Sequence, residues 1–214
     1  RVLKPLCLRR AAVIAAASEA TRHDLRLFYR FPESKMQVVY DGFQDLSRFE
    51  VNAPQVDQTL KPYFFFAGKV KYRKNVHGIV SAFIEFKKRT GAPAHLVIAG
   101  DYGGEYYEKI VRQLREADME SAIHFVGYAS GPQLYSFYKQ ALAVVFPSIN
   151  EGFGMPIIEA MSVGTPVITS NISSMAEAAG NAALLVDPHD AGDIARAMER
   201  IYADTALREK LRKK

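Results

Sequence analysis

Cysteine is almost absent from this sequence. Cys7 is the only one among 214 residues, so the chain cannot form an internal disulfide. Disulfides belong mainly to oxidising compartments, and a chain without them is typical of a reducing one. We therefore expect a cytoplasmic protein, and a position at the inner face of the cell membrane stays open within that expectation.

Long apolar segments are absent as well. No apolar run approaches the roughly 20 residues that a transmembrane helix needs. Arg9 and Arg10 split the apolar stretch near the start, which argues against a signal peptide there. The basic ends of the chain leave open a peripheral contact with anionic lipid, although solvated helix faces explain them more simply.

The overall charge narrows the function only a little. The net charge is +5, with 49% hydrophobic and 24% charged residues, which is the mixture of a soluble globular protein. A basic chain suits an anionic ligand, nucleic acid or a membrane surface, and the net charge alone selects none of them.

Apolar strands alternate with helices through most of the chain. Because fully apolar strands belong to parallel sheets covered on both faces, the pattern predicts a doubly wound, Rossmann-like α/β domain over residues 62–204. The expected strands are 63–68, 95–100, 123–127, 142–148, 166–170 and 183–187. The expected helices are 75–89, 105–118, 132–141, 153–164, 174–180 and 191–204.

The residues before this domain have a different pattern. A helix is expected over 18–31, with Ser18 as its N-cap, and a strand over 36–42. Residues 43–61 have no clear period and contain prolines, which is typical of a linker.

The loop SINEGFGMP (148–156), whose first seven residues we call the glycine loop, follows a predicted strand and opens a helix. Its two glycines, Gly152 and Gly154, allow the backbone to approach a ligand closely. The free N–H groups of Phe153, Gly154 and Met155 at the start of the helix would attract a phosphate.

Two glutamates, Glu151 and Glu159, frame this helix start and lie eight positions apart. Carboxylates bind vicinal hydroxyls, so Glu159 is expected to hold a ribose and Glu151 the hydroxyls of a sugar, with a diphosphate between them. The simpler interpretation is that Glu151 caps a helix and Glu159 lies on a solvated face. For the glutamates alone the two interpretations weigh equally.

A second loop, GKVKYRKN (68–75), which we call the basic loop, carries four cations after the first strand of the domain. They are Lys69, Lys71, Arg73 and Lys74. Ligands of doubly wound sheets bind at the carboxyl ends of the strands, where this loop meets the glycine loop. The pair of loops therefore favours a diphosphate over a merely solvated basic loop.

Three patterns together resemble the C-terminal, donor-binding domain of retaining glycosyltransferases of family 4, which have the GT-B fold. They are E-x7-E within PSINEGFGMPIIEAMSVGTPVITSN (147–171), the basic segment FAGKVKYRKN (66–75) and the segment NAALLVDPHD (181–190). The resemblance implies that residues 1–45 are the tail of a missing N-terminal acceptor domain and 46–61 the interdomain linker. It leaves 62–204 as the nucleotide-sugar domain and 205–214 as the start of a C-terminal helix.

The resemblance also implies a role for each matching residue. Arg73 and Lys74 would neutralise the phosphates of the donor, whereas Lys69 stands where many members carry arginine. The segment Val126, Gly127 and Tyr128 would lie along the base, and Glu159 would bind the ribose. The sugar and β-phosphate would be held by Glu151, Gly152, Phe153, Gly154 and Met155, and Glu151, Arg73 and Lys74 are the expected catalytic residues.

The implied reaction is transfer of a hexose from a nucleotide-diphosphate sugar to a glycan or lipid-linked acceptor, with retention. GDP-mannose is the favoured donor and a UDP-hexose the next. The resemblance implies no metal or other cofactor, and the absence of an Asp-x-Asp motif from the sequence is consistent with that. No nucleic-acid partner is expected. The alternatives are a non-catalytic nucleotide-binding module that works with a separate acceptor-binding chain, and a nucleotide-sugar epimerase of the same fold.

One further pair has a structural explanation. Ser174 and Glu177 form the pattern S-x-x-E, which predicts a capping box at the start of the helix over 174–180.

Overall fold

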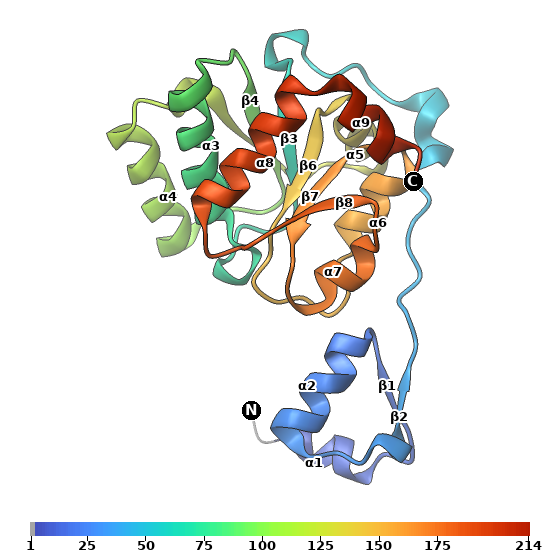
Figure 1. Cartoon of the computed structure of the whole chain (residues 1–214). Helices are drawn as coiled ribbons and strands as arrows, with labels where there is room; N and C mark the ends of the chain where they lie inside the picture. The colour runs from blue at the N-terminus through green and yellow to red at the C-terminus, as the bar shows by residue number, and fades with distance from the viewer. Residues whose placement is uncertain (1–2) are drawn as a thin grey trace.

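The centre of the larger part of the molecule is a six-stranded parallel sheet. The fold is known from a computed structural model, which describes residues 3–214 (Figure 1). The strands are β3 (Tyr63–Ala67), β4 (His95–Ala99), β5 (Ile123–Gly127), β6 (Ala143–Phe146), β7 (Val167–Ser170) and β8 (Ala183–Val186). Their order in the sheet is β5-β4-β3-β6-β7-β8, and all neighbouring strands are parallel. The doubly wound α/β fold predicted from the sequence is confirmed.

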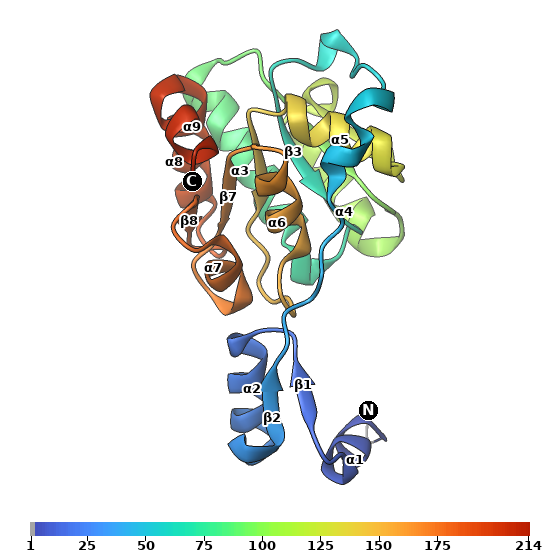
Figure 2. The ribbon, with the colours of Figure 1, turned by 90° about the vertical axis from the view of Figure 1, so that its right-hand side faces the viewer.

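Helices cover both faces of this sheet, which explains why its central strands are apolar throughout. Helices α3 and α8 pack together on one face, and α5 and α6 lie on the other (Figures 1 and 2). Every residue of β3 and β6 is buried as a result. The helices are α3 (Val76–Thr90), α4 (Gly104–Glu116), α5 (Gly131–Gln140), α6 (Met155–Ser162), α7 (Ser173–Ala179), α8 (Ala191–Ala203) and α9 (Thr205–Arg212).

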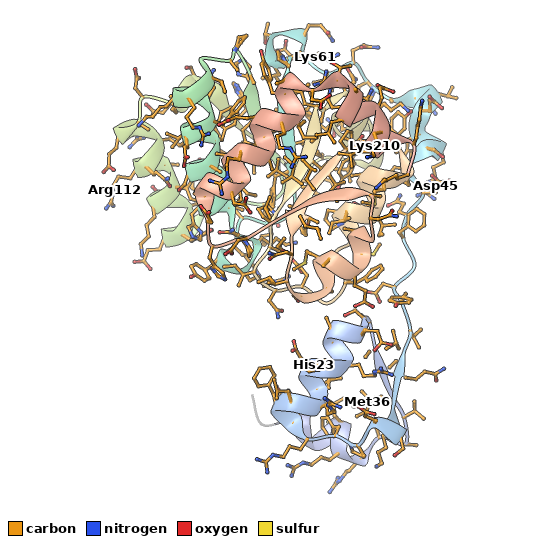
Figure 3. The ribbon with its side chains drawn as sticks, in the orientation of Figure 1. His23, Met36, Asp45, Lys61, Arg112 and Lys210 are labelled. Carbon is orange, nitrogen blue, oxygen red and sulfur yellow. The ribbon has the colours of Figure 1, made fainter. Side chains whose placement is uncertain are left out.

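Residues 3–40 form a smaller unit, which we call the N-terminal lobe. Its elements are α1 (Leu3–Arg10), β1 (Ile14–Ala16), α2 (Glu19–Tyr29) and β2 (Met36–Val38). The two strands pair in parallel around a small core of Ile14, Phe31 and Met36, the last labelled in Figure 3. Ser18 caps α2 as predicted, because its hydroxyl accepts from the N–H of Thr21. The strand expected over 36–42 ends at Val38.

The segment predicted as a linker has more structure than its sequence pattern indicates. It contains two 3-10 helices, Leu46–Asn52 and Gln58–Leu60. Leu46 and Val56 are buried in the main core, and the hydroxyl of Ser136 on α5 donates to the carbonyl of Pro54 at 2.6 Å. Short 3-10 turns have no 3.6-residue period, so the apolar pattern missed them.

None of the helices within residues 3–214 combines the length and the apolar character that crossing a membrane requires.

Asn75, which ends the basic loop, holds together three segments of the sheet's carboxyl edge. Its side-chain amide is buried and donates to the carbonyls of Pro147 (3.1 Å) and Pro188 (2.6 Å). Its backbone is left-handed, with φ 56°. A Cβ on Gly78, one turn into α3, would lie 2.4 Å from the Asn75 amide oxygen, so glycine is required there. The asparagine therefore fixes the basic loop against the ends of β6 and β8.

We expect Asn75→Ala to lower the free energy of unfolding by about 2–4 kcal/mol, since two buried carbonyls lose their donor and alanine disfavours a left-handed backbone. Urea denaturation of the purified chain measures the change. Asn181→Ala, at an exposed position, is the matched control and should leave stability within about 0.5 kcal/mol. A loss from Asn75→Ala no larger than that of the control would contradict this role.

Candidate functional site

The basic loop and the glycine loop meet where the strand order of the sheet reverses. They follow β3 and β6, the neighbouring strands from which the chain proceeds outward in opposite directions. The N–H of Ile149 in the glycine loop donates to the carbonyl of Arg73 in the basic loop at 2.9 Å. The loops are thus joined directly at the topological switch point, the position at which doubly wound sheets bind their ligands.

An ion cluster lies at this junction. The carboxylate of Glu151 pairs with Lys74 at 2.9 Å and also with the guanidinium of Arg73. The side chains of Lys74 and Glu151 are only 13% and 11% exposed, so their attraction is weakly screened by water. The sequence placed these three residues near one ligand, and the structure adds that they bind one another.

The Lys74 side chain packs against Phe146 and Gly68. Its ammonium nitrogen lies 4.7 Å from the centre of the Phe146 ring, a cation–π distance. On the other side it passes Gly68, where a Cβ would lie 3.2 Å from the ammonium nitrogen. Glycine at position 68, with φ 144°, therefore leaves the room that Lys74 occupies.

The helix start beside the cluster offers free donors. Helix α6 begins at Met155, two residues later than predicted, because Gly154 has φ 113° and interrupts the helical backbone. Within residues 3–214, the N–H groups of Phe153, Gly154 and Met155 have no hydrogen-bond acceptor. Free amides at the positive end of a helix attract phosphate, and the adjacent cations strengthen that attraction.

A hollow of about 310 Å³ opens along the carboxyl ends of β3 and β4. Two of its lining residues approach each other closely, since a Cβ on Gly100 would lie 2.3 Å from the carbonyl oxygen of Gly68. The hollow is lined by Ala67, Gly68, Lys69, Ala99, Gly100, Asp101, Tyr128, Ala129, Leu134, Pro156 and Glu159. The sequence analysis, including the family resemblance, pointed to Gly68, Lys69, Tyr128 and Glu159, and missed Leu134, which lies within α5.

Glu159 lines this hollow and is held by Tyr138. The tyrosine hydroxyl, buried at the end of α5, donates to the Glu159 carboxylate at 3.0 Å. Burial raises the pKa of Glu159 above its ordinary value, while the Tyr138 hydrogen bond and the charge of Lys74 act in the opposite direction. Tyr138 reads as an ordinary core aromatic in the sequence, so no local signal identified it.

The other predicted site residues differ in how they relate to the hollow: some line it and others lie beside it. Tyr128 lines the hollow but is 82% exposed, whereas Val126 is 37% exposed and does not line it. The carbonyl of Gly127 accepts from the N–H of Gly100 at 2.7 Å, which places this segment beside the loop after β4. Lys69 lines the hollow and pairs with Asp101 at 3.5 Å.

The capping box predicted for Ser174 and Glu177 is wrong. Helix α7 begins at Ser173 with Ile172 at the N-cap, and no side chain caps it. The Ser174 hydroxyl instead donates to the carbonyl of Glu151 at 3.0 Å. The Glu177 carboxylate accepts from the N–H groups of Glu19 and Ala20, at the start of α2. Long-range contacts with the glycine loop and the N-terminal lobe outcompete the local pattern.

Metal-ligating side chains do not cluster in the described part of the chain: residues 3–214 contain no group of three or more His, Cys, Asp or Glu that could hold a metal ion.

The fold is a doubly wound α/β domain with two loops joined at its switch point, and comparison with known proteins gives the family. The chain belongs to the glycosyl transferases group 1 family, whose model matches residues 48–214. It is 35% identical over 148 residues to O-antigen chain mannosyltransferase B of Escherichia coli, covering 69% of this chain and 38% of that protein. It is 30% identical over 195 residues to O-antigen chain mannosyltransferase RfbU of Salmonella typhimurium, covering 89% and 51%.

Solved structures share this fold. A sucrose-phosphate synthase from Thermosynechococcus elongatus superposes with a TM-score of 0.81 at 26% identity, over 99% of this chain and 54% of that one. The Anabaena protein Alr3699/HepE, solved in complex with UDP and glucose, gives a TM-score of 0.79 at 20% identity, over 97% and 58%. The fold is that of the GT-B glycosyltransferases. The chain spans about half or less of the length of the curated relatives it matches.

The raised pKa of Glu159 predicts a pH-dependent stability. As pH rises, the unfolded chain releases this proton first, so the folded state loses stability between the ordinary pKa and the raised folded one. Glu159→Gln does not titrate, so its free energy of unfolding relative to wild type should be higher at about pH 7 than at about pH 4. Urea denaturation at both values tests this, with Glu108→Gln on an exposed face as control. A difference that is the same at both pH values would contradict it.

Proposed function

We propose that this chain is the donor-binding part of a glycosyltransferase that transfers a hexose from a nucleotide-diphosphate sugar to a glycan or lipid-linked acceptor. The observation that carries the proposal is the cluster of Lys74, Arg73 and Glu151 beside the free amides of the glycine loop. Membership of the glycosyl transferases group 1 family supports it.

The diphosphate of the donor would bind at this cluster. Lys74 and Arg73 provide two cations, and Phe153, Gly154 and Met155 provide amides at a helix start. A phosphate group binds the same cations that now hold Glu151, so donor binding displaces that carboxylate from Lys74. When the glycosidic bond breaks, the same donors stabilise the negative charge that develops on the departing diphosphate.

The nucleoside would occupy the hollow. Glu159 lies on its wall and, when ionised, accepts hydrogen bonds from both ribose hydroxyls, while Tyr138 fixes the orientation of its carboxylate. The base would lie along the segment 126–128, with Tyr128 and Leu134 providing apolar surface. Glycines 68 and 100 keep the floor free of side chains.

The sugar would lie over the glycine loop. Once freed from Lys74, Glu151 can accept hydrogen bonds from sugar hydroxyls, and Gly152, Phe153 and Gly154 provide backbone groups beside them. We propose transfer with retention and without a metal, in which the leaving phosphate oxygen assists the acceptor hydroxyl. Lys74 and Arg73 then take the part that a divalent cation plays in other phosphate sites.

GDP-mannose is the donor that we favour. Two similar relatives carry the name mannosyltransferase, which supports mannose as the sugar, and the choice of GDP rests on the family resemblance of the basic loop and the glycine loop. A UDP-hexose is the second choice, since a structural neighbour was solved with UDP and glucose.

Lys74→Ala should weaken binding of a nucleoside diphosphate by about ten- to a hundredfold and leave nucleoside binding unchanged, since a charge-assisted contact contributes about 1.5–3 kcal/mol. Calorimetric titration of the purified chain measures both affinities. Lys74→Met keeps an apolar stem over Phe146 and should behave like alanine, which separates charge from packing. Lys88→Ala, an exposed lysine of α3 outside both loops, is the matched control. Equal losses for both ligands would refute the assignment.

The choice of base has its own test. Titration with GDP and with UDP, each beside its sugar conjugate, should show tighter binding of GDP. Tenfold tighter binding of UDP, a gap of about 1.4 kcal/mol, would overturn the GDP-mannose proposal and leave the transferase proposal standing. Addition of EDTA should change none of these affinities, and a loss would count against metal-free binding.

A further inference from the structure

The first turn of α2 rests on α7 and on the glycine loop. Figures 1 and 2 both show the N-terminal lobe below the carboxyl ends of the sheet strands, with α2 directly beneath α7. One residue of α7, Glu177, and one of the glycine loop, Gly152, make the polar contacts with α2, so elements more than 130 residues apart in sequence meet here.

A carboxylate from α7 caps α2. The two oxygens of Glu177 accept from the backbone N–H groups of Glu19 at 2.9 Å and of Ala20 at 3.2 Å. These are two of the four N–H groups that a helix start leaves without a partner, and the positive end of the helix favours an anion there. The contact therefore fastens the N-terminal lobe to the larger domain by charge as well as by hydrogen bonds.

The same turn of α2 holds the backbone of the glycine loop. The hydroxyls of Ser18 and Thr21 donate to the carbonyl oxygen of Gly152, at 2.7 and 3.0 Å. Ser18 is completely buried by this contact. Beyond β2, the ring of Tyr40 lies 5.3 Å from the ring of Phe153. The N-terminal lobe thus touches two consecutive residues of the loop.

Helix α7 holds the loop from the other side. The hydroxyl of Ser174 donates to the carbonyl of Glu151 at 3.0 Å, and Ser174 is one turn from Glu177 on the same short helix. The carbonyls of Glu151 and Gly152 are therefore both fixed, one by α7 and the other by α2. Because the carbonyl of Gly152 belongs to the same peptide group as the N–H of Phe153, holding it also sets the direction of that N–H.

We propose that Glu177 is a positioning residue for donor binding. Its carboxylate docks α2, docked α2 holds the Gly152–Phe153 peptide, and that peptide presents its N–H to the diphosphate. The proposal rests on the proposed function, since it names what orients the same site. Coupling of this kind is reciprocal, so a bound diphosphate also strengthens the docking of α2.

A merely structural glutamate would behave differently from a positioning one. Loss of general stability weakens every ligand alike, whereas a misdirected peptide weakens only a ligand that uses its N–H. The nucleoside lies in the hollow formed by other loops and does not reach this peptide. The difference between diphosphate and nucleoside affinity therefore separates the two roles.

The docking itself is tested by hydrogen exchange of the purified chain. In the wild type, the amides of Glu19 and Ala20 should exchange slowly. Glu177→Ala should speed their exchange by about tenfold or more, since each loses its acceptor. Glu177→Gln keeps one acceptor oxygen and should restore part of the protection. Rapid exchange of both amides in the wild type would overturn the proposal.

The coupling is tested by calorimetric titration of the same variants with GDP, UDP and the free nucleosides. Glu177→Ala should weaken diphosphate binding by about five- to thirtyfold and leave nucleoside binding within about twofold. Thr21→Val, which removes one hydroxyl at nearly constant shape, should act in the same direction. When it is combined with Glu177→Ala, the losses should not add, because both residues hold the same peptide. Glu108→Ala, an exposed glutamate of α4, is the control and should change neither affinity.

Two further outcomes would count against the proposal in distinguishable ways. Unchanged diphosphate affinity in Glu177→Ala, with rapid exchange at residues 19 and 20, would show that docking does not position the loop. Failure of the wild-type chain to bind any nucleoside diphosphate would overturn the proposed function, and the positioning role with it. If the amides of residues 19 and 20 exchange slowly in a chain that binds no diphosphate, the contact between Glu177 and α2 has a structural role only.

Discussion

The ion pair between Lys74 and Glu151 is the interaction on which the site depends. Two largely buried charges must compensate each other, because either charge alone would lose its hydration and have no opposite charge beside it. The surrounding residues meet this requirement. Gly68 leaves room for the lysine, Phe146 offers the face of its ring, and Asn75 fixes the loop that carries Lys74. A ligand with its own negative charge can take the place of Glu151 without leaving the lysine unpaired.

The contacts that support the site extend from the switch point of the sheet to the N-terminal lobe. The carbonyls of Glu151 and Gly152 in the glycine loop are held from outside, by α7 and α2 respectively. The two helices are joined by Glu177, whose carboxylate belongs to one and caps the other. The docking of α2 and the shape of the proposed phosphate site are thereby linked through one short stretch of backbone, Glu151 to Phe153.

Much of this organisation could be predicted from the sequence. The fully apolar strands specify a parallel sheet, and the glycines and cations after β3 and β6 predict the edge of the sheet at which a ligand would bind. The residues that sequence reasoning missed act over long distances. Tyr138 looks like any core aromatic, and the partners of Asn75 lie 72 and 113 residues away. Glu177 fits a local capping rule, but its carboxylate bonds the start of α2 instead, which no local pattern could indicate.

The most direct measurement is a crystal structure of this chain with a bound nucleoside diphosphate. If the diphosphate displaces Glu151, the ammonium of Lys74 should contact a phosphate oxygen. The amides at the start of α6 should make a second contact with the phosphates. The Glu151 carboxylate then lies out of hydrogen-bond range of Lys74. A diphosphate bound elsewhere, with the Lys74–Glu151 pair intact, would contradict the central claim.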